Sequence, residues 1–188
     1  MKIADGIYVI PEFLNLSKCA SLIKLSEEYG YEEATVSLPG KAQMMKGVRN
    51  NDRVIFEDSN LADQLFSKVR TFIPEIYNEL PPHSLNERFR FYRYTPNQRF
   101  KRHIDGVQTS GDRKSRVTML MYLNDDLEGG ETIFREKGVM PGSNDEYIIS
   151  PEAGMALLFR HKLWHEGAPV KNGSKYVLRT DVFYNESD

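Results

Sequence analysis

A histidine and an aspartate stand two residues apart in the segment Arg99–Gly106. In an extended strand residues i and i+2 point to the same side, so the His103 imidazole and the Asp105 carboxylate are expected to face one metal ion while Ile104 points away. Such a pair can supply two ligands. It also arises often by chance in a chain with four histidines, so the pair alone is weak evidence for a metal site.

A second histidine, His165, lies far downstream of this pair. Two histidines and one carboxylate on one side of a metal form the facial triad of non-heme Fe(II) oxygenases, which leaves three coordination positions open. His103, Asp105 and His165 together therefore predict a site for Fe(II) at which a cosubstrate and oxygen have room. His161 is a minor alternative for the third ligand.

Length, charge and cysteine content restrict the class of protein. At 188 residues the chain suits one domain that can bury its own core. A formal charge of -2 gives no overall attraction to nucleic acid or acidic membranes, and no stretch approaches the roughly 18 apolar residues of a membrane span. The lone Cys19 excludes an internal disulfide. We therefore expect a cytoplasmic chain whose partner is neither nucleic acid nor a membrane; its oligomeric state stays open.

The first part of the chain contains two helical patterns. A helix is expected over 17–29, with Ser17 as its N-cap and Gly30 as its stop. A second helix is expected over 59–72, where apolar residues recur at helical spacing, and Pro74 marks its break. These helices would stand before the residues that carry the chemistry.

The character changes near residue 87, where alternating side chains begin. Residues 88–94 alternate with period two and predict a strand with one aromatic face. Further strands are expected over 116–123, 130–134, 147–150, 155–159 and 175–184, separated by turn signals. Helices followed by many short strands indicate an α+β chain that is rich in β structure.

Three blocks occur in an order that matches a known family. Tyr94–Gln98 precedes the His-x-Asp pair, Gly129–Phe134 follows it, and Gly167–Lys175 lies beyond the second histidine. Over residues 86–184 the sequence therefore resembles the 2-oxoglutarate and Fe(II)-dependent oxygenases of the prolyl 4-hydroxylase type. Asn97 stands where that family usually has glycine, and Asn tolerates the left-handed backbone that glycine would supply.

The resemblance implies a fold and a division of the chain. The family fold is a double-stranded β-helix, or jelly roll, here with supporting N-terminal helices. We expect residues 1–188 to form a single dioxygenase domain, in which 1–85 provide helical and lid support and 86–184 form the catalytic core.

The resemblance also implies an activity. Fe(II) and O2 would be used with 2-oxoglutarate as cosubstrate and ascorbate as reductant, and an unactivated C–H bond would be hydroxylated with release of succinate and CO2. A peptidyl proline is the favoured substrate. A small molecule or free amino acid, hydroxylated by the same mechanism, is the alternative, and a metal-binding sensor without catalysis is less favoured because the complete ligand set is present.

The family also suggests which residues hold the cosubstrate. In the prolyl 4-hydroxylases a lysine ten residues after the distal histidine binds the remote carboxylate of 2-oxoglutarate, and Lys175 stands at that spacing from His165. Arg179 is a second candidate because it shares a strand face with Lys175 and its guanidinium can bind carboxylate in a bidentate way. Tyr94 and Tyr122 align with positions that give phenolic hydrogen bonds to the cosubstrate.

A polar cluster precedes the apolar run at 54–56. Arg49, Asn51 and Arg53 lie in a segment without core pattern, and the simplest interpretation is a solvated turn. The alternative hypothesis is that the three residues contact substrate as part of a lid over the iron.

Overall fold

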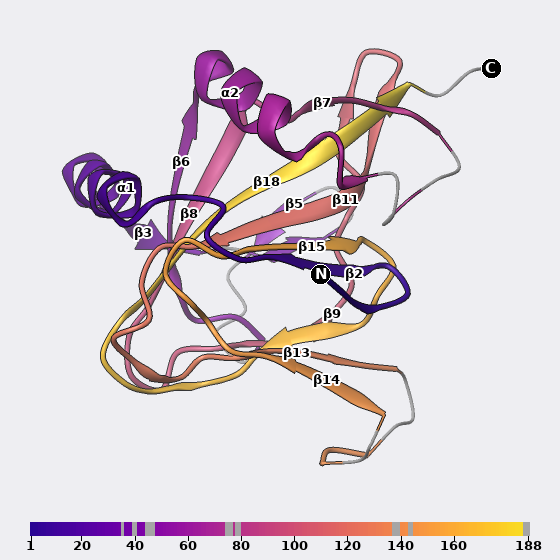
Figure 1. Ribbon diagram of the computed structural model, residues 1–188. Helices are drawn as coiled ribbons and strands as arrows, with labels where there is room; N and C mark the ends of the chain where they lie inside the picture. The colour runs from indigo at the N-terminus through magenta and orange to yellow at the C-terminus, as the bar shows by residue number, and fades with distance from the viewer. Residues whose placement is uncertain are drawn as a thin grey trace.

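The computed structural model describes residues 1–34, 36–38, 41–43, 48–73, 77, 80–136, 140–142 and 145–185. In this part of the chain two antiparallel sheets face each other, and two helices lie against the outer face of the larger sheet (Figure 1). The expected β-rich architecture is confirmed, and the two facing sheets fit a jelly roll. None of the helices in the described residues is long and apolar enough to cross a bilayer.

The larger sheet has the strand order β1-β2-β15-β11-β18-β8-β6-β3, with β10 paired to β11 and β7 paired to β18. Its strands are β1 (Lys2–Ala4), β2 (Ile7–Ile10), β3 (Glu32–Glu33), β6 (Asp52–Glu57), β7 (Pro82–Leu85), β8 (Arg88–Tyr94), β10 (Thr109–Ser110), β11 (Arg113–Tyr122), β15 (Ala156–Arg160) and β18 (Lys175–Asn185). The strands predicted over 116–123, 155–159 and 175–184 are confirmed as β11, β15 and β18 within a few residues.

The smaller sheet has the order β14-β13-β16-β9. Two separate two-stranded sheets pair β12 with β17 and β4 with β5. These strands are β4 (Val36–Leu38), β5 (Lys41–Gln43), β9 (Phe100–His103), β12 (Glu128–Gly129), β13 (Thr132–Arg135), β14 (Glu146–Ile149), β16 (His165–Gly167) and β17 (Val170–Asn172). The strands predicted over 130–134 and 147–150 correspond to β13 and β14.

Strand β8 shows why both faces of the larger sheet are buried. Phe89 and Phe91 point to the side that packs with the helices, whereas Tyr92 and Tyr94 point to the side that faces the smaller sheet. The period of two predicted this strand correctly, but the expectation of a single aromatic face was wrong. Aromatic residues serve two different cores because the sheet is covered on both sides.

Helix α1 (Leu16–Tyr29) begins one residue earlier than predicted. Its N-cap is Asn15, whose side chain accepts a hydrogen bond from the Lys18 backbone N–H at 2.7 Å, so the assignment of Ser17 as N-cap was wrong. Both residue types cap helices well, and the extended backbone at Asn15 decides between them. Gly30 ends the helix as predicted, with a φ of 78°.

Helix α2 (Ser59–Val69) opens where the sequence indicated, with Asp58 as its N-cap. It ends before Phe72, whose side chain is 36% exposed, so the predicted extension of the helix to that residue was wrong. The predicted break at Pro74 lies outside the described residues.

The segment expected to be a loop before the catalytic core is partly a strand. Residues 32–33 and 36–38 form β3 and β4, and residues 39–40 and 44–47 lie outside the described residues. At its end Arg53 belongs to β6, which pairs antiparallel with β8. The loop assignment was wrong there because the edge of β8 supplies hydrogen bonds that a local sequence pattern does not reveal.

A tight approach at Gly154 allows a stability prediction. This glycine has a φ of +85°, and a Cβ atom there would lie 2.1 Å from the Leu14 carbonyl oxygen. We expect Gly154→Ala to lower the free energy of unfolding by at least ~2 kcal/mol, because backbone strain and a steric clash add together. Gly142→Ala is the matched control, since its φ of +77° gives strain but nothing lies within 4 Å of the added Cβ. Equal urea midpoints for the two variants would contradict this account.

Candidate active site

Two strands of the smaller sheet bring the two candidate histidines together. His103 is the last residue of β9 and His165 the first of β16, and the two are direct antiparallel partners. Asp105 follows two residues after β9, and its backbone N–H donates to the His161 carbonyl at 3.0 Å. The pairing of β9 with β16 thus brings together two side chains that lie more than sixty residues apart in the sequence.

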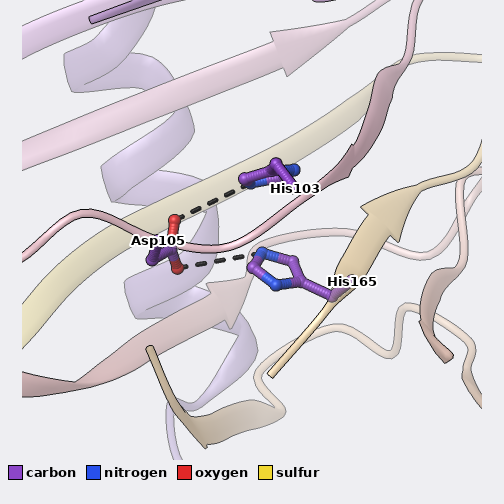
Figure 2. A group of neighbouring side chains, drawn as sticks. All are labelled: His103, Asp105 and His165. Atoms are coloured by element: carbon purple, nitrogen blue, oxygen red, sulfur yellow. Dashed lines mark ion pairs between the residues drawn. The ribbon is translucent and has the colours of Figure 1, made fainter. Parts of the chain in front are cut away.

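The three predicted metal ligands meet at one point (Figure 2). The His103 Nε2 lies 3.7 Å from one Asp105 carboxylate oxygen, and the His165 Nε2 lies 3.7 Å from the other. One potential ligand atom from each residue lies within 4.8 Å of the other two. The described residues contain no other cluster of three or more such side chains. His161, the minor alternative, lies outside this cluster.

Hydrogen bonds to the backbone orient both imidazoles. The His103 Nδ1 lies 2.9 Å from the Lys101 carbonyl oxygen, and the His165 Nδ1 lies 2.9 Å from the Leu163 carbonyl oxygen. Because a carbonyl oxygen can only accept, each Nδ1 carries the proton and donates it, which leaves a lone pair on each Nε2. Both lone pairs face Asp105, an arrangement typical of histidines that bind a metal.

The protonation states of His103, Asp105 and His165 also suit the binding of a metal cation. Burial lowers the pKa of His103 to about 3, with a smaller contribution from His165, and burial lowers the pKa of His165 as well. Burial alone would raise the pKa of Asp105, but Arg179 and the two histidines outweigh it and hold the pKa well below the ordinary carboxyl range. Two neutral imidazoles and one carboxylate are therefore present near neutral pH, and these are the forms that ligate Fe(II).

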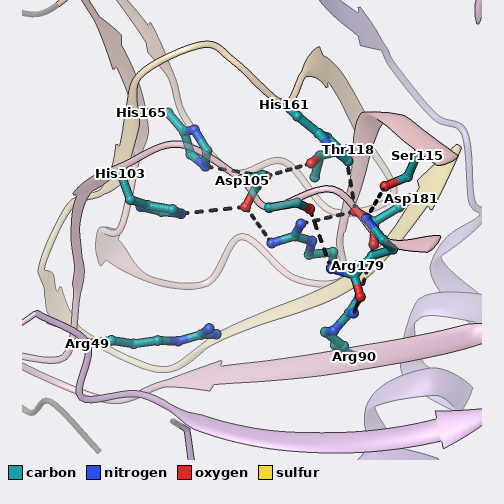
Figure 3. Close-up of polar contacts among 12 residues, drawn as sticks. Arg49, Arg90, His103, Asp105, Ser115, Thr118, His161, His165, Arg179 and Asp181 are labelled. Atoms are coloured by element: carbon teal, nitrogen blue, oxygen red, sulfur yellow. Dashed lines mark hydrogen bonds and ion pairs between the residues drawn. The ribbon is translucent and has the colours of Figure 1, made fainter. Parts of the chain in front are cut away.

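Two further side chains hold the Asp105 carboxylate in place. Arg179 donates from Nη1 to one oxygen at 2.7 Å, and Thr118 donates from Oγ1 to the other at 2.5 Å (Figure 3). The orientation of the carboxylate is thus fixed from the side opposite the histidines. The sequence did not reveal the role of Thr118, although its position in the alternating strand β11 places it on the inner face.

Behind Asp105 lies a buried network of charges. Arg179 also donates from Nη2 to Asp181 at 3.0 Å, and Asp181 accepts from Arg90 at 3.0 Å. The His161 Nε2 lies 3.5 Å from an Asp181 carboxylate oxygen, so this buried histidine faces Asp181. The ion pair between Arg179 and Asp181 belongs to this buried network.

This network predicts a pH-dependent loss of stability. We expect Arg179→Met to lower the free energy of unfolding by about 3–5 kcal/mol at pH 7, because Asp105 and Asp181 would lose their shared buried cation. Arg179 helps hold the pKa of both carboxyl groups below the ordinary range in the folded protein. Two carboxylates with lowered pKa values stabilise the fold at pH values above their unfolded pKa of about 4, and this stabilisation is lost as the pH falls. The difference between variant and wild type should therefore shrink toward pH 4. Urea titrations of variant and wild type at pH 7 and pH 4 measure the difference in unfolding free energy, and an equal difference at the two pH values would contradict the charge argument.

An inner pocket leads from the histidines to Lys175. It is lined by residues of both sheets, among them Tyr94, Thr132, Phe159, His165 and Lys175. The Lys175 side chain is 4% exposed, donates to the Gly130 carbonyl, and makes no ion pair with any carboxylate in the described chain. Burial lowers its pKa to about 7. A buried ammonium group that lacks a carboxylate partner suits the remote carboxylate of 2-oxoglutarate.

The two predicted phenols lie beside this lysine. The Lys175 ammonium is 5.4 Å from the Tyr94 ring centroid and 5.3 Å from that of Tyr122. The Tyr122 hydroxyl is 2.7 Å from the Thr132 Oγ1. Thr132 was missed as a lining residue, although the alternation of β13 turns it inward. Arg179 lies at the metal end of the same pocket, already paired with two aspartates, so the contacts favour Lys175 as the cosubstrate anchor.

An outer pocket begins at the same metal-facing residues and runs in another direction. Like the inner pocket it is lined by Tyr92, Phe100, His103, Asp105 and Arg179, and it continues over the remaining lining residues, Val48, Arg49, Arg53, Arg88, Arg90, Ile104, Gly106 and Gln108. Tyr92 was interpreted from the sequence as a core aromatic; it is buried, yet it also lines both pockets.

The polar cluster at residues 49–53 is not a solvated turn. Arg49 is 5% exposed and Asn51 is fully buried, so that interpretation was wrong for both. Arg49 donates from Nε to the Asn51 side-chain oxygen at 2.6 Å, and Arg53 lies on β6 beside the outer pocket. The structure thus places Arg49 and Arg53 at the outer pocket and Asn51 behind Arg49, while a lid role stays a prediction.

Comparison with known proteins agrees with this geometry. The family model of the 2OG-Fe(II) oxygenase superfamily matches residues 89–180. Among curated relatives, probable prolyl 4-hydroxylase 11 of Arabidopsis thaliana is 30% identical over 79% of this chain and 56% of its own length. Prolyl 4-hydroxylase 1 of the same organism is 26% identical over 90% of this chain and 66% of its own length. The chain thus spans less than two thirds of these relatives.

Solved structures share the fold over nearly the whole chain. A prolyl-4-hydroxylase of Pseudomonas putida superimposes with a TM-score of 0.69 at 19% identity, covering 97% of this chain and 94% of that one. A viral collagen prolyl hydroxylase of Paramecium Bursaria Chlorella virus-1, solved as a 2OG complex, gives a TM-score of 0.64 at 22% identity, covering 96% and 97%. Residues 89–180 belong to the 2OG-Fe(II) oxygenase superfamily, and the chain is similar to prolyl 4-hydroxylases.

Proposed function

We propose that this chain is an Fe(II)- and 2-oxoglutarate-dependent dioxygenase that hydroxylates an unactivated C–H bond. The observation that carries the proposal is that two pockets meet at His103 and Asp105, beside His165. One of them leads to a buried lysine that pairs with no carboxylate in the described residues. The proposal includes O2 as oxidant, ascorbate as reductant and residues 1–188 as one domain. It also includes a cytoplasmic location, which the single buried Cys19 supports.

In this proposal one group of residues would bind the iron and another would bind the cosubstrate. His103, Asp105 and His165 would hold the metal on one side, and Arg179 and Thr118 would keep the Asp105 carboxylate in position. When bound, Fe(II) supplies the redox chemistry that couples decarboxylation of 2-oxoglutarate by O2 to insertion of oxygen into a C–H bond.

The inner pocket fits the cosubstrate because its charge lies at the far end. Lys175 would pair with the C5 carboxylate of 2-oxoglutarate, so that the keto acid end points back to the metal ligands. Tyr94 and Tyr122, whose rings flank Lys175, would exclude water from that ion pair and strengthen it. With the inner pocket filled, the outer pocket is the remaining approach for the substrate.

A peptidyl proline is the substrate we favour, since the curated relatives named above are prolyl 4-hydroxylases or probable ones. A solved structure from Trichoplax adhaerens is a prolyl hydroxylase in complex with a hypoxia inducible factor peptide, and it shares the fold with a TM-score of 0.69. A free amino acid or another small molecule is the second candidate, supported by the arginines that line the outer pocket and could bind its carboxylate.

Uncoupled turnover tests the proposed reaction before any substrate is known. Incubation with Fe(II), ascorbate and 2-oxoglutarate should release succinate at a rate above that of the metal-free chain. A panel of proline-containing peptides and free amino acids should then include one that raises the rate and gains one oxygen atom by mass spectrometry. No succinate in the presence of iron, with 2-oxoglutarate binding also absent, would refute the proposal.

A further inference from the structure

The outer pocket carries an excess of positive charge that the metal site does not require. Five arginines line it, and Asp105 is the one carboxylate among its described lining residues. Arg90 and Arg179 are already paired with Asp105 and Asp181. The arginines of this pocket place positive charge along the route by which a substrate reaches the metal ligands, in a chain whose formal charge is slightly negative.

Arg49 is the most informative of these arginines. Its side chain is 5% exposed, yet it makes no ion pair with any carboxylate in the described part of the chain, and its Nη2 is buried without a hydrogen-bond partner. Burial of an uncompensated guanidinium is costly, so such a group marks a place for a missing anion. In Figure 3 the Arg49 side chain extends across the site toward Arg179.

Neighbouring groups hold the Arg49 guanidinium in a fixed plane. Its central carbon lies 4.2 Å from the Tyr92 ring centroid and 4.4 Å from that of Phe100, and its Nε donates to the Asn51 side-chain oxygen. Phe100 in turn stacks on His103, with ring centroids 3.6 Å apart. The unbonded Nη2 of Arg49 is therefore pre-organised beside a candidate metal ligand, where an anionic group can accept a charge-assisted hydrogen bond.

We propose that the substrate carries a carboxylate, and that Arg49 binds this carboxylate in the outer pocket while the C–H bond to be oxidised faces His103. The inference rests on the proposed oxygenase function and specifies its substrate class. A free amino acid and a peptide with an acidic side chain both supply the required group. The arginines at positions 53 and 88 add a positive field along the pocket that favours an anion over a neutral ligand.

Binding without turnover tests the inference directly. The chain is loaded with Zn(II) and saturated with 2-oxoglutarate, and four probes are titrated by calorimetry: L-proline, L-prolinamide, and amidated, acetylated Glu-Pro-Glu and Gln-Pro-Gln. The acidic probes, L-proline and the Glu peptide, carry carboxylates that their partners replace by neutral amides. We expect at least one acidic probe to bind ten- to a hundredfold more tightly than its amide partner, the range for one charge-assisted hydrogen bond. A preference within the proline pair would indicate a free acid as substrate, and a preference within the peptide pair would indicate an acidic peptide. The preference should fall as salt is raised.

Variants of Arg49 test whether this side chain causes the preference for acidic probes. Arg49→Gln should remove the discrimination between acidic and neutral probes, whereas Arg49→Lys should retain part of it because charge remains without the planar fork. Arg70→Gln, the same change of charge at the exposed end of α2, is the matched control and should keep the full preference. Thermal unfolding of each variant establishes that it is folded, and the wild-type titrations decide the question even where a variant does not fold.

Several outcomes would overturn the inference. Equal affinity within both probe pairs, or no binding of either acidic probe by a chain that binds 2-oxoglutarate, would do so while leaving the proposed function intact. A loss of 2-oxoglutarate affinity in Arg49→Gln with unchanged probe discrimination would instead assign Arg49 to the cosubstrate. Tighter binding of a single-stranded oligonucleotide than of either acidic probe would assign the pocket to a polyanion. Failure to bind 2-oxoglutarate at all would count against the proposed function itself.

Discussion

Replacing His103, Asp105 or His165 by alanine is expected to reduce succinate formation from 2-oxoglutarate to background. Each change leaves two protein ligands at a site whose three donor atoms otherwise lie within 4.8 Å of one another. Loss of a residue that only supports a metal ligand costs about 10–100-fold in metal affinity, so loss of a ligand itself should cost at least as much. Calorimetric titration with Fe(II) under anaerobic conditions measures the affinity, and the succinate assay measures the turnover.

The control for this prediction is another histidine of the same chain. His83 lies on β7, is exposed, and does not belong to the ligand cluster, so His83→Ala should bind iron and form succinate as the wild type does. Near-UV circular dichroism should show that all four variants retain the fold. Full activity in any one ligand variant would remove that residue from the proposed triad.

The second large effect is expected at Lys175. Lys175→Ala should raise the apparent KM for 2-oxoglutarate by about 10–100-fold, because the buried C5 carboxylate would lose a charge-assisted hydrogen bond of roughly 1.5–3 kcal/mol. Arg179→Gln should raise this KM less, since the two Arg179 nitrogens that donate are already bonded to Asp105 and Asp181. The opposite ranking of the two variants would make Arg179 the anchor.

The same lysine predicts how cosubstrate binding depends on pH. In the free protein burial lowers the pKa of Lys175 to about 7, so above that pH the side chain is mainly neutral and must take up a proton to pair with a carboxylate. The affinity for 2-oxoglutarate should therefore fall as the pH rises from 7 to 9. Lys175→Arg is the control, because a guanidinium stays charged over this range. A pH-independent affinity in the wild type would contradict the role of Lys175.

The sequence predicted that His103, Asp105 and His165 would meet, because these candidate ligands obey local rules or fixed spacing. Alternation in an extended segment placed His103 and Asp105 on one side, and the family blocks fixed the register of His165 and Lys175. The turn at Asn97 also agrees with expectation, since that residue has a φ of 70°. These features depend on short stretches of chain, which a sequence pattern represents directly.

What the sequence did not reveal depends on strand pairing across long separations. The burial of Arg49 results from its bridge to Phe100 and from Tyr92 on the neighbouring strand β8, neither of which is near in sequence. The pairing of Arg179 with Asp105 likewise joins residues 74 positions apart. Charged residues before an apolar run therefore looked like a solvated turn, although two sheets enclose them.

The central claim, an iron-dependent oxygenase reaction with 2-oxoglutarate, is tested most directly by isotope labelling. The wild-type chain is incubated with Fe(II), ascorbate, 2-oxoglutarate and ¹⁸O₂, and succinate is analysed by mass spectrometry beside the Asp105→Ala variant. The account predicts succinate that carries one ¹⁸O atom, formed by the wild type and not by the variant. Succinate without label, or equal amounts from both proteins, would contradict it.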